Sequence, residues 1–365
     1  MDLSRLEVAP GILEPRGLSR REFLKLCTAT AVALGLSEGF GPRLAEAAEQ
    51  AARKKPVIWM QGQGCTGCSE STLSSLNPGP AEIVLDMLSI RYHPTIMAAS
   101  GHVAQKAWKD SVEAGGYVLV LEGSIPTADP RFAEVEGKAF ADQFKEAAAR
   151  ADLVVAAGSC ASFGGIPRAG ITKGGGVADY IKDKPVVNVP SCPAKPSRLL
   201  GTLLHVLAFK KTPELDEYKR PVPYYKRFLQ HDNCPRRAHF EKSEFLRDWN
   251  DPAQVNYCLL YMGCKGPKTY TDCPRIWWND GVNYCINAGS PCAGCTQPEF
   301  YDQFTPLYVK QENFPLPGVG GVSTGTVAKM VAGATGIGIA AHAAARVATQ
   351  AARGEVTAGE SKISG

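Results

Sequence analysis

Hydrophobic and polar positions alternate in blocks between residues 55 and 210, in a pattern that predicts strands separated by helices. Four short runs are apolar or β-branched and are bounded by Gly, Pro or Ser, or lie close to such residues, as buried strands do. These runs are Pro56–Met60, Tyr117–Leu121, Leu153–Ala157 and Val186–Val189. Helical periodicity is found over Ala81–Leu88 and Phe140–Ala149. The alternation predicts an α/β domain over residues 48–211, with a parallel sheet and helices on both faces.

The periodic pattern disappears between about residues 212 and 310. Proline, aromatic and charged residues crowd together there, and seven cysteines fall between positions 234 and 295. A segment with so little regular pattern rarely buries a hydrophobic core, so it needs another source of stability, such as metal centres. We therefore expect a second, loop-rich domain over residues 212–316.

The remaining tail, residues 317–365, is rich in Gly and Ala. Met330 to Ala345 carries no charged residue apart from His342. A membrane-spanning helix needs about twenty apolar residues, and this stretch is shorter and only weakly hydrophobic. Two interpretations remain open, a membrane-anchoring helix and a flexible or partner-docking tail.

The first 47 residues have the layout of a twin-arginine export signal. Arg20 and Arg21 precede an apolar stretch over Leu26–Leu36, and an A-x-A site follows at Ala45-Glu46-Ala47. The alternative is an ordinary amphipathic N-terminal helix. The signal predicts a periplasmic protein, and its removal takes Cys27 away from the mature chain.

Composition and charge narrow the class of protein. The chain has 365 residues, 44% hydrophobic content and 21% charged content, which is ordinary for a soluble protein. Its net charge is only +4, and no Lys/Arg run with interleaved aromatics is present, which argues against nucleic-acid binding. The unusual feature is the twelve cysteines. Without Cys27 their number is odd, which argues against complete disulfide pairing.

Cysteines follow three of the four predicted strands. Cys65 and Cys68 come after the first strand, Cys160 after the third and Cys192 after the fourth. Because ligands of open α/β sheets bind at the carboxyl ends of the strands, we expect these four thiols to meet at one edge of the sheet. The alternative is a scatter of core cysteines, but core cysteines belong inside strands rather than in the Gly/Pro loops after them.

The mature cysteines and one histidine divide into three sets of four, the usual number of protein ligands of an iron–sulphur cubane. The first set is Cys65, Cys68, Cys160 and Cys192. The second set is His231, Cys234, Cys258 and Cys264. The third set is Cys273, Cys285, Cys292 and Cys295. Zinc is the alternative metal for the second and third sets, whereas the first is too dispersed in sequence for a typical zinc site.

Several motifs around these ligands resemble the small subunit of nickel–iron hydrogenases. The matching segments are residues 61–70 (QGQGCTGCSE), 158–165 (GSCASFGG), 190–193 (PSCP), 231–235 (HDNCP), 263–267 (GCKGP) and 272–274 (DCP). The resemblance extends from the export signal to about residue 310. It implies a flavodoxin-like parallel-sheet domain followed by a loop-rich iron–sulphur domain. It also implies that the first set holds a proximal 4Fe–4S cluster, the second a distal 4Fe–4S cluster and the third a medial cluster.

The sequence departs from the common family pattern at Cys285, where many members have proline and a 3Fe–4S medial cluster. The fourth thiolate predicts a 4Fe–4S medial cluster with a lowered potential, as in nickel–iron–selenium relatives. The alternative is that Cys285 is a free thiol.

Oxygen-tolerant members carry two further cysteines where this chain has Gly67 and Gly165. The resemblance thus implies an ordinary proximal cubane and a complex that oxygen inactivates.

The resemblance places the reaction in a partner. The family's nickel–iron centre is held by two C-x-x-C pairs of a large subunit, whereas both such pairs here, Cys65/Cys68 and Cys292/Cys295, already belong to cluster sets. This chain is then expected to relay electrons from reversible H2 oxidation to an acceptor such as a cytochrome, with Glu70 as a candidate for proton movement. Basic residues near the second set, Arg236, Arg237 and Lys265, are candidates for steering an acidic redox partner. Two alternatives remain, an iron–sulphur subunit of another oxidoreductase and a zinc-stapled exported binding protein.

Overall fold

The structure is a computed structural model, and it describes residues 56–76, 78–83, 88–278, 281–300, 313–316 and 320–352, with the single residues 28 and 42. The predicted export signal lies outside the described residues, apart from those two. The chain divides into two units, residues 1–309 and residues 310–365, and each is treated by itself.

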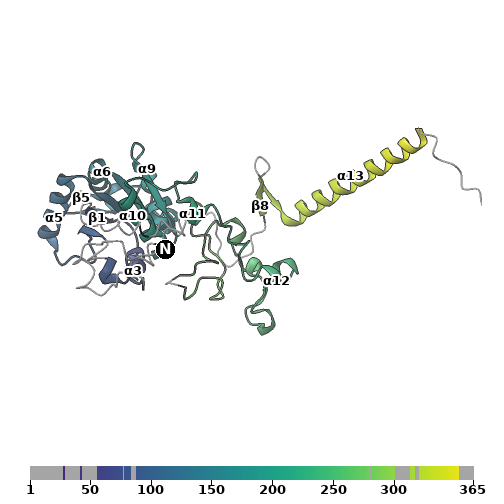
Figure 1. The fold of residues 1–365 in the computed structure, drawn as a ribbon, viewed down its shortest axis with the longest axis horizontal. Coiled ribbons are helices and arrows are strands. Elements are labelled where there is room, and N and C mark those ends of the chain that lie inside the picture. Colours follow the sequence, from purple (N-terminus) through teal and green to yellow (C-terminus); the bar gives the residue numbers. More distant parts are fainter. Residues whose placement is uncertain are drawn as a thin grey trace, which may run out of the picture. The chain divides into compact units, whose positions relative to one another are not determined.

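A five-stranded parallel sheet forms the centre of the first unit (Figure 1). Its strands are β1 (Pro56–Gln61), β2 (Ser89–Tyr92), β3 (Val118–Glu122), β6 (Leu153–Ala157) and β7 (Val186–Val189). The order β2-β1-β3-β6-β7, with every neighbouring pair parallel, is the flavodoxin-like order. The structure confirms the predicted α/β class and the four predicted strands, with shifts of one residue at the ends of β1 and β3.

Helices cover both faces of this sheet because successive strand residues point to opposite sides. On one face, Val118 and Val120 belong to a core that includes the leucines of α10 (Pro196–Phe209). On the other face, Leu119 and Leu121 pack in a core with α5 (Gly101–Ala114), α6 (Phe140–Arg150) and α9 (Val177–Tyr180). The two cores hold the carboxyl ends of the strands in fixed positions, which is what a ligand site at that edge requires.

Two expectations about local structure need correction. The sequence pattern did not identify β2, because this edge strand is short and half-buried rather than apolar. The helix predicted over Ala81–Leu88 is described only as α4 (Pro80–Glu82), Leu88 is not helical, and residues 84–87 lie outside the described residues. The other short elements of this region are α3 (Gly67–Leu73), η4 (Pro130–Phe132), β4 (Glu134–Val135), β5 (Lys138–Ala139), α7 (Gly158–Phe163) and α8 (Gly165–Ala169).

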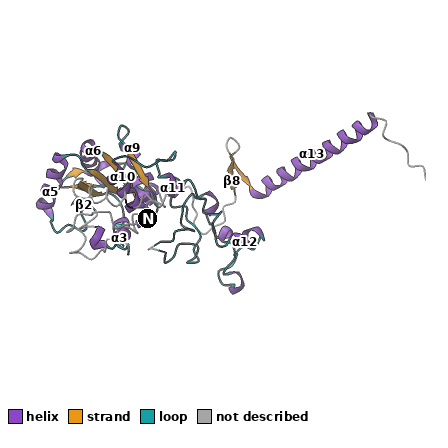
Figure 2. Ribbon diagram, in the orientation of Figure 1, coloured by secondary structure: helices purple, strands orange, loops and turns teal. Residues whose placement is uncertain are grey.

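Loops predominate after α10 in the first unit, as predicted (Figure 2). The regular elements there are α11 (Val222–Tyr225), α12 (Arg237–Glu241), η5 (Pro252–Gln254), η6 (Leu259–Met262) and η7 (Gly266–Lys268). A small apolar cluster includes Leu246, Leu259 and Ile286, and the cysteines Cys234, Cys264, Cys273 and Cys292 belong to it or pack against it. The core of this region is therefore built around its candidate ligands.

The described residues of the second unit form an antiparallel hairpin, β8 (Asn313–Leu316) and β9 (Gly320–Ser323), and the helix α13 (Thr324–Ala352). Among the described residues, no helix combines the length and the apolar character needed to cross a membrane.

Candidate metal centres

The four thiols of the first set lie together at the carboxyl edge of the sheet. Cys65 follows β1, Cys68 lies in the first turn of α3, Cys160 lies in α7 and Cys192 follows β7. Burial, followed by the nearby Cys192 and Cys65, raises the pKa of Cys160 to about 12. Burial also raises the pKa of Cys68, with Glu122 and then Cys160 and Cys192 adding to the effect. Thiols that influence one another in this way are neighbours in space, as the strand pattern predicted.

Glycines and a backbone amide shape the space around these thiols. A Cβ at Gly158 (φ +82) would lie under 3.0 Å from Cys68 Sγ, and a Cβ at Gly165 (φ +53) would lie 2.7 Å from Cys160 Sγ. The backbone N–H of Ala194 donates to Cys68 Sγ over 3.2 Å. Side chains are excluded and a donor is provided next to the sulphurs, which fits a bound cluster whose thiolates accept hydrogen bonds.

A buried carboxylate that the sequence pattern missed supports the Cys65–Cys68 loop. Glu122, 3% exposed, accepts hydrogen bonds from the backbone N–H groups of Cys68 (2.9 Å) and Ser69 (3.2 Å). The side chains of Trp59 (3.0 Å) and Gln61 (3.1 Å) also donate to it. Glu122 ends β3, beside β1 at the point where the strand order reverses. A carboxylate at the end of an otherwise apolar strand was the available sequence signal.

His93 extends this network and is expected to make stability depend on pH. Its Nε2 lies 3.2 Å from Ser69 Oγ, its ring stacks on Trp59, and burial lowers its pKa from 6.5 to about 4. Between these values the unfolded chain binds a proton that folded His93 does not, so stability falls as the pH drops from 6.5 toward 4. In His93→Gln we expect a weaker decline, measured as the unfolding temperature at successive pH values. His102→Gln, which changes an exposed histidine, is the control. If His93→Gln shows the same pH dependence of the unfolding temperature as the wild type, His93 is not the group responsible for the decline.

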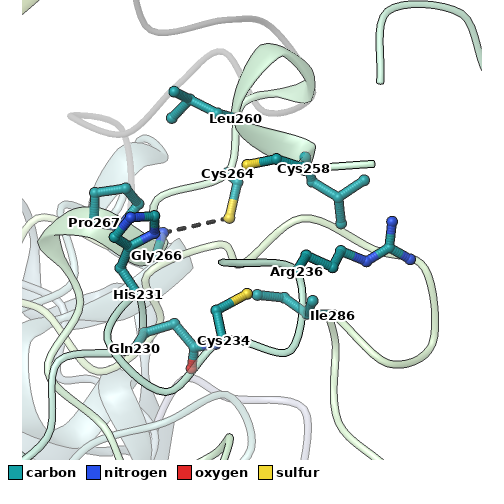
Figure 3. Close-up of a pocket in the computed structure, with 11 residues that line it drawn as sticks. Gln230, His231, Cys234, Arg236, Cys258, Leu260, Cys264, Gly266, Pro267 and Ile286 are labelled. Atoms are coloured by element: carbon teal, nitrogen blue, oxygen red, sulfur yellow. Dashed lines mark hydrogen bonds between the residues drawn. The ribbon is translucent and has the colours of Figure 1, made fainter. Parts of the chain in front are cut away.

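The second set lines a single cavity in the loop-rich region. His231, Cys234, Cys258 and Cys264 surround a space of about 330 Å³ that includes volume open to solvent (Figure 3). Cys264 Sγ accepts from the backbone N–H groups of Gly266 (3.4 Å) and Cys292 (3.4 Å). Burial lowers the pKa of His231, with Arg237 adding to the effect, so the imidazole is held in the neutral form that binds metals. The structure therefore brings all four predicted residues of this set to one site.

The third set is also brought together, although its members differ in exposure. Cys285 is exposed, whereas Cys273, Cys292 and Cys295 are half-buried. Burial and then the neighbouring Cys273 raise the pKa of both Cys285 and Cys295. Arg198 Nη2 donates to Cys273 Sγ over 3.2 Å. Cys285 thus lies near the other candidate ligands of its set.

Contacts connect the third set to each of the other two. On one side, Ser159, next to Cys160, donates a hydrogen bond from its hydroxyl to the Cys295 carbonyl. On the other side, the backbone N–H of Cys292 donates to Cys264 Sγ. The third set accordingly lies between the first and second sets.

Glu70, the candidate for proton movement, is exposed on α3, two residues after Cys68. It therefore lies beside the first set without being enclosed by it.

Within the described ranges, no three His, Cys, Asp or Glu side chains converge closely enough to hold one metal ion. A four-iron cluster binds its thiolates to different irons, so its ligands do not need to converge on one point.

Two family matches divide the first unit at nearly the same place as the fold. Residues 65–206 match the family described as NADH ubiquinone oxidoreductase, 20 Kd subunit. Residues 225–308 match the family that covers the C-terminal part of the NiFe/NiFeSe hydrogenase small subunit. The first match alone would fit the alternative of another iron–sulphur oxidoreductase, but the second does not. These matches place the chain in the class of oxidoreductase subunits.

Comparison with individual proteins then gives the family. The chain is 40% identical to the uptake hydrogenase small subunit of Azotobacter vinelandii, over 94% of this chain and 96% of the relative. It is 40% identical to the periplasmic [NiFe] hydrogenase small subunit of Solidesulfovibrio fructosivorans, over 81% and 94%. A structure of the reduced, active Ni-Fe-Se hydrogenase from Desulfomicrobium baculatum matches with a TM-score of 0.65 and 38% identity, covering 71% of this chain and 100% of that chain. The chain belongs to the family of nickel–iron hydrogenase small subunits.

Proposed function

We propose that this chain relays electrons through three iron–sulphur clusters, between the H2-cleaving centre of a hydrogenase large subunit and an external acceptor such as a cytochrome. The observation that supports it most directly is the position of the third ligand set, which contacts both the first and the second. Electron transfer through protein needs closely spaced centres, and three adjoining ligand sets provide a continuous path.

The proposal assigns one cluster to each set. The first set would hold the proximal 4Fe–4S cluster, the third the medial cluster and the second the distal 4Fe–4S cluster. Each cluster, when bound, would accept and release one electron at a time. Thiolates of this chain would hold each cluster, and the imidazole of His231 would be a fourth ligand of the distal cluster. Backbone N–H groups that donate to sulphur, and the exclusion of water, would set the reduction potential of each cluster. Glu70, exposed beside the first set, is proposed as part of a proton route that the partner would complete.

Purification of the complex tests this proposal. A large subunit that contains nickel should co-purify with this chain, and the complex should contain iron and acid-labile sulphide in amounts that fit three clusters. Zinc at the second and third sets, in place of iron and sulphide, would refute it. Co-purification with a nickel-free oxidoreductase subunit would also refute it.

The medial cluster is proposed to be 4Fe–4S, with Cys285 as its fourth ligand. Removing one thiolate from a cubane frees one iron, so Cys285→Ala is expected to convert this cluster to 3Fe–4S. The measurement is EPR of the oxidised complex, in which a 3Fe–4S signal should appear in the variant and be absent from the wild type. A strong 3Fe–4S signal in the wild type would show that Cys285 is not a ligand.

For location, we propose export to the periplasm by the twin-arginine route. The support is the signal layout of residues 1–47 and the similarity to a periplasmic relative. We also propose that the exported protein is attached to the inner membrane, through residues 317–365 or through its electron acceptor.

A further inference from the structure

A buried group of three charged side chains lies between the first and third ligand sets. Lys195 lies three residues after Cys192, and Asp272 directly precedes Cys273. The side chains of Lys195, Arg198 and Asp272 are 2%, 0% and 2% exposed. Arg198 Nε donates to Asp272 Oδ1 over 2.9 Å, and Lys195 Nζ lies 3.3 Å from the same oxygen. One carboxylate therefore serves two cations.

The group carries one uncompensated positive charge. Two cations and one carboxylate leave a net charge of +1 where water does not reach. Burying an unbalanced charge is unfavourable unless another group of opposite sign is close by. The neighbouring acceptor is Cys273, whose Sγ receives a hydrogen bond from Arg198 Nη2 (3.2 Å). The same nitrogen also donates to Thr271 Oγ1 over 2.6 Å.

Arg198 has a further donor without an acceptor. Its Nη1 is buried and has no hydrogen-bond partner among the described residues. The guanidinium lies over the Tyr225 ring, 5.1 Å from the centroid, which holds it in place. A buried donor beside a ligand thiol fits an acceptor on the bound cluster, because cluster sulphides accept hydrogen bonds.

We infer that Arg198 is a positioning residue for the third ligand set, and that its guanidinium raises the reduction potential of the cluster held by Cys273. The inference rests on the proposed function. A reduced cluster carries one more negative charge than an oxidised one, so a positive donor at a ligand sulphur stabilises the reduced form more. This effect opposes that of the fourth thiolate from Cys285. The two residues would together keep the medial potential within range of its neighbours.

A redox titration of the purified complex, monitored by EPR spectroscopy, tests the inference. The Cys285→Ala background gives the medial cluster a signal of its own. In that background Arg198→Met, which leaves Asp272 paired with Lys195, is expected to change the reduction equilibrium about tenfold toward the oxidised form. That change is a lowering of about 59 mV for a one-electron couple. Arg198→Lys, which keeps the charge without the planar fork, should shift the potential in the same direction by less.

Two controls separate the hydrogen bond from charge in general. Arg275→Met removes an exposed arginine two residues after Cys273 and should leave the potential unchanged, because solvent screens that charge. Lys195→Met removes a buried charge but no donor to Cys273, so its shift should be smaller than that of Arg198→Met. If Arg198→Met fails to assemble, Arg198→Lys is compared with Arg275→Lys. Equal potentials in the Cys285→Ala parent and in its Arg198 variants would overturn the inference. An iron-free wild-type complex would refute the proposed function itself.

Discussion

Asp272→Asn is expected to destabilise the protein by about 3–5 kcal/mol, the usual effect of removing one partner of a buried ion pair. Although burial opposes ionisation, Arg198 and Lys195 hold the pKa of Asp272 below its usual value, so the carboxylate is charged in the folded protein. Without it, two cations with almost no exposed surface would lie next to each other with no anion to balance them. Asparagine keeps the volume of the side chain, so the loss reports charge rather than packing.

The measurement for Asp272→Asn is urea-induced unfolding of the purified complex, monitored by circular dichroism. Asp129→Asn is the matched control, because Asp129 pairs with Arg131 at the surface, where an ion pair contributes little to stability. Equal midpoints for the two variants would show that the buried carboxylate is not essential to the fold. Iron content measured on the same samples distinguishes loss of stability from loss of a cluster.

Gly158→Ala is expected to prevent binding of the proposed proximal cluster. Gly158 has a φ of +82, which an alanine adopts only with strain of about 1–2 kcal/mol. The larger effect is steric, since the new Cβ would lie under 3.0 Å from Cys68 Sγ. Cys68 Sγ must then move away from the other three thiols of the first set. Iron content should fall by the equivalent of one cluster, and electron transfer to an external acceptor should be lost.

Gly116→Ala is the control for this change. Gly116 has a similar φ of +68, but a Cβ there would have no atom within 4 Å. It therefore imposes the same backbone strain without touching a ligand. Full iron content in both variants would show that the close approach at Gly158 is not required for cluster binding.

The sequence predicted the parts of this protein that have local signals. Strands such as Leu153–Ala157 are apolar runs with clear ends, and cysteines placed just after them were expected to meet at one edge. The edge strand Ser89–Tyr92 was missed because it is short, half-buried and has no apolar run. Glu122 was missed although a carboxylate at the end of an apolar strand was a local signal. The group of Arg198, Lys195 and Asp272 had no local signal, because its partners are distant in the sequence.

One functional expectation from the sequence changes with the structure. The basic residues near the second set do not form a free cationic surface. Arg237 pairs with Asp232 and Glu241, and Lys265 is buried. Arg236 donates to the carbonyls of Val255 and Tyr257. Their positions in the sequence identified these residues as neighbours of the second set. Only the folded structure shows which carboxylates and carbonyls their charged groups contact.

The distribution of ligands along the chain has a consequence for maturation. The first set draws on residues 65–192 and needs three strands of the sheet in register before its thiols meet, whereas the third lies within residues 273–295. Closing long loops carries a larger entropic penalty and slows the formation of distant contacts. We therefore expect the proximal cluster to enter only an already folded sheet, while the medial site assembles locally. Cluster insertion would then report the completion of folding, which would serve as a checkpoint before the proposed export of the folded chain.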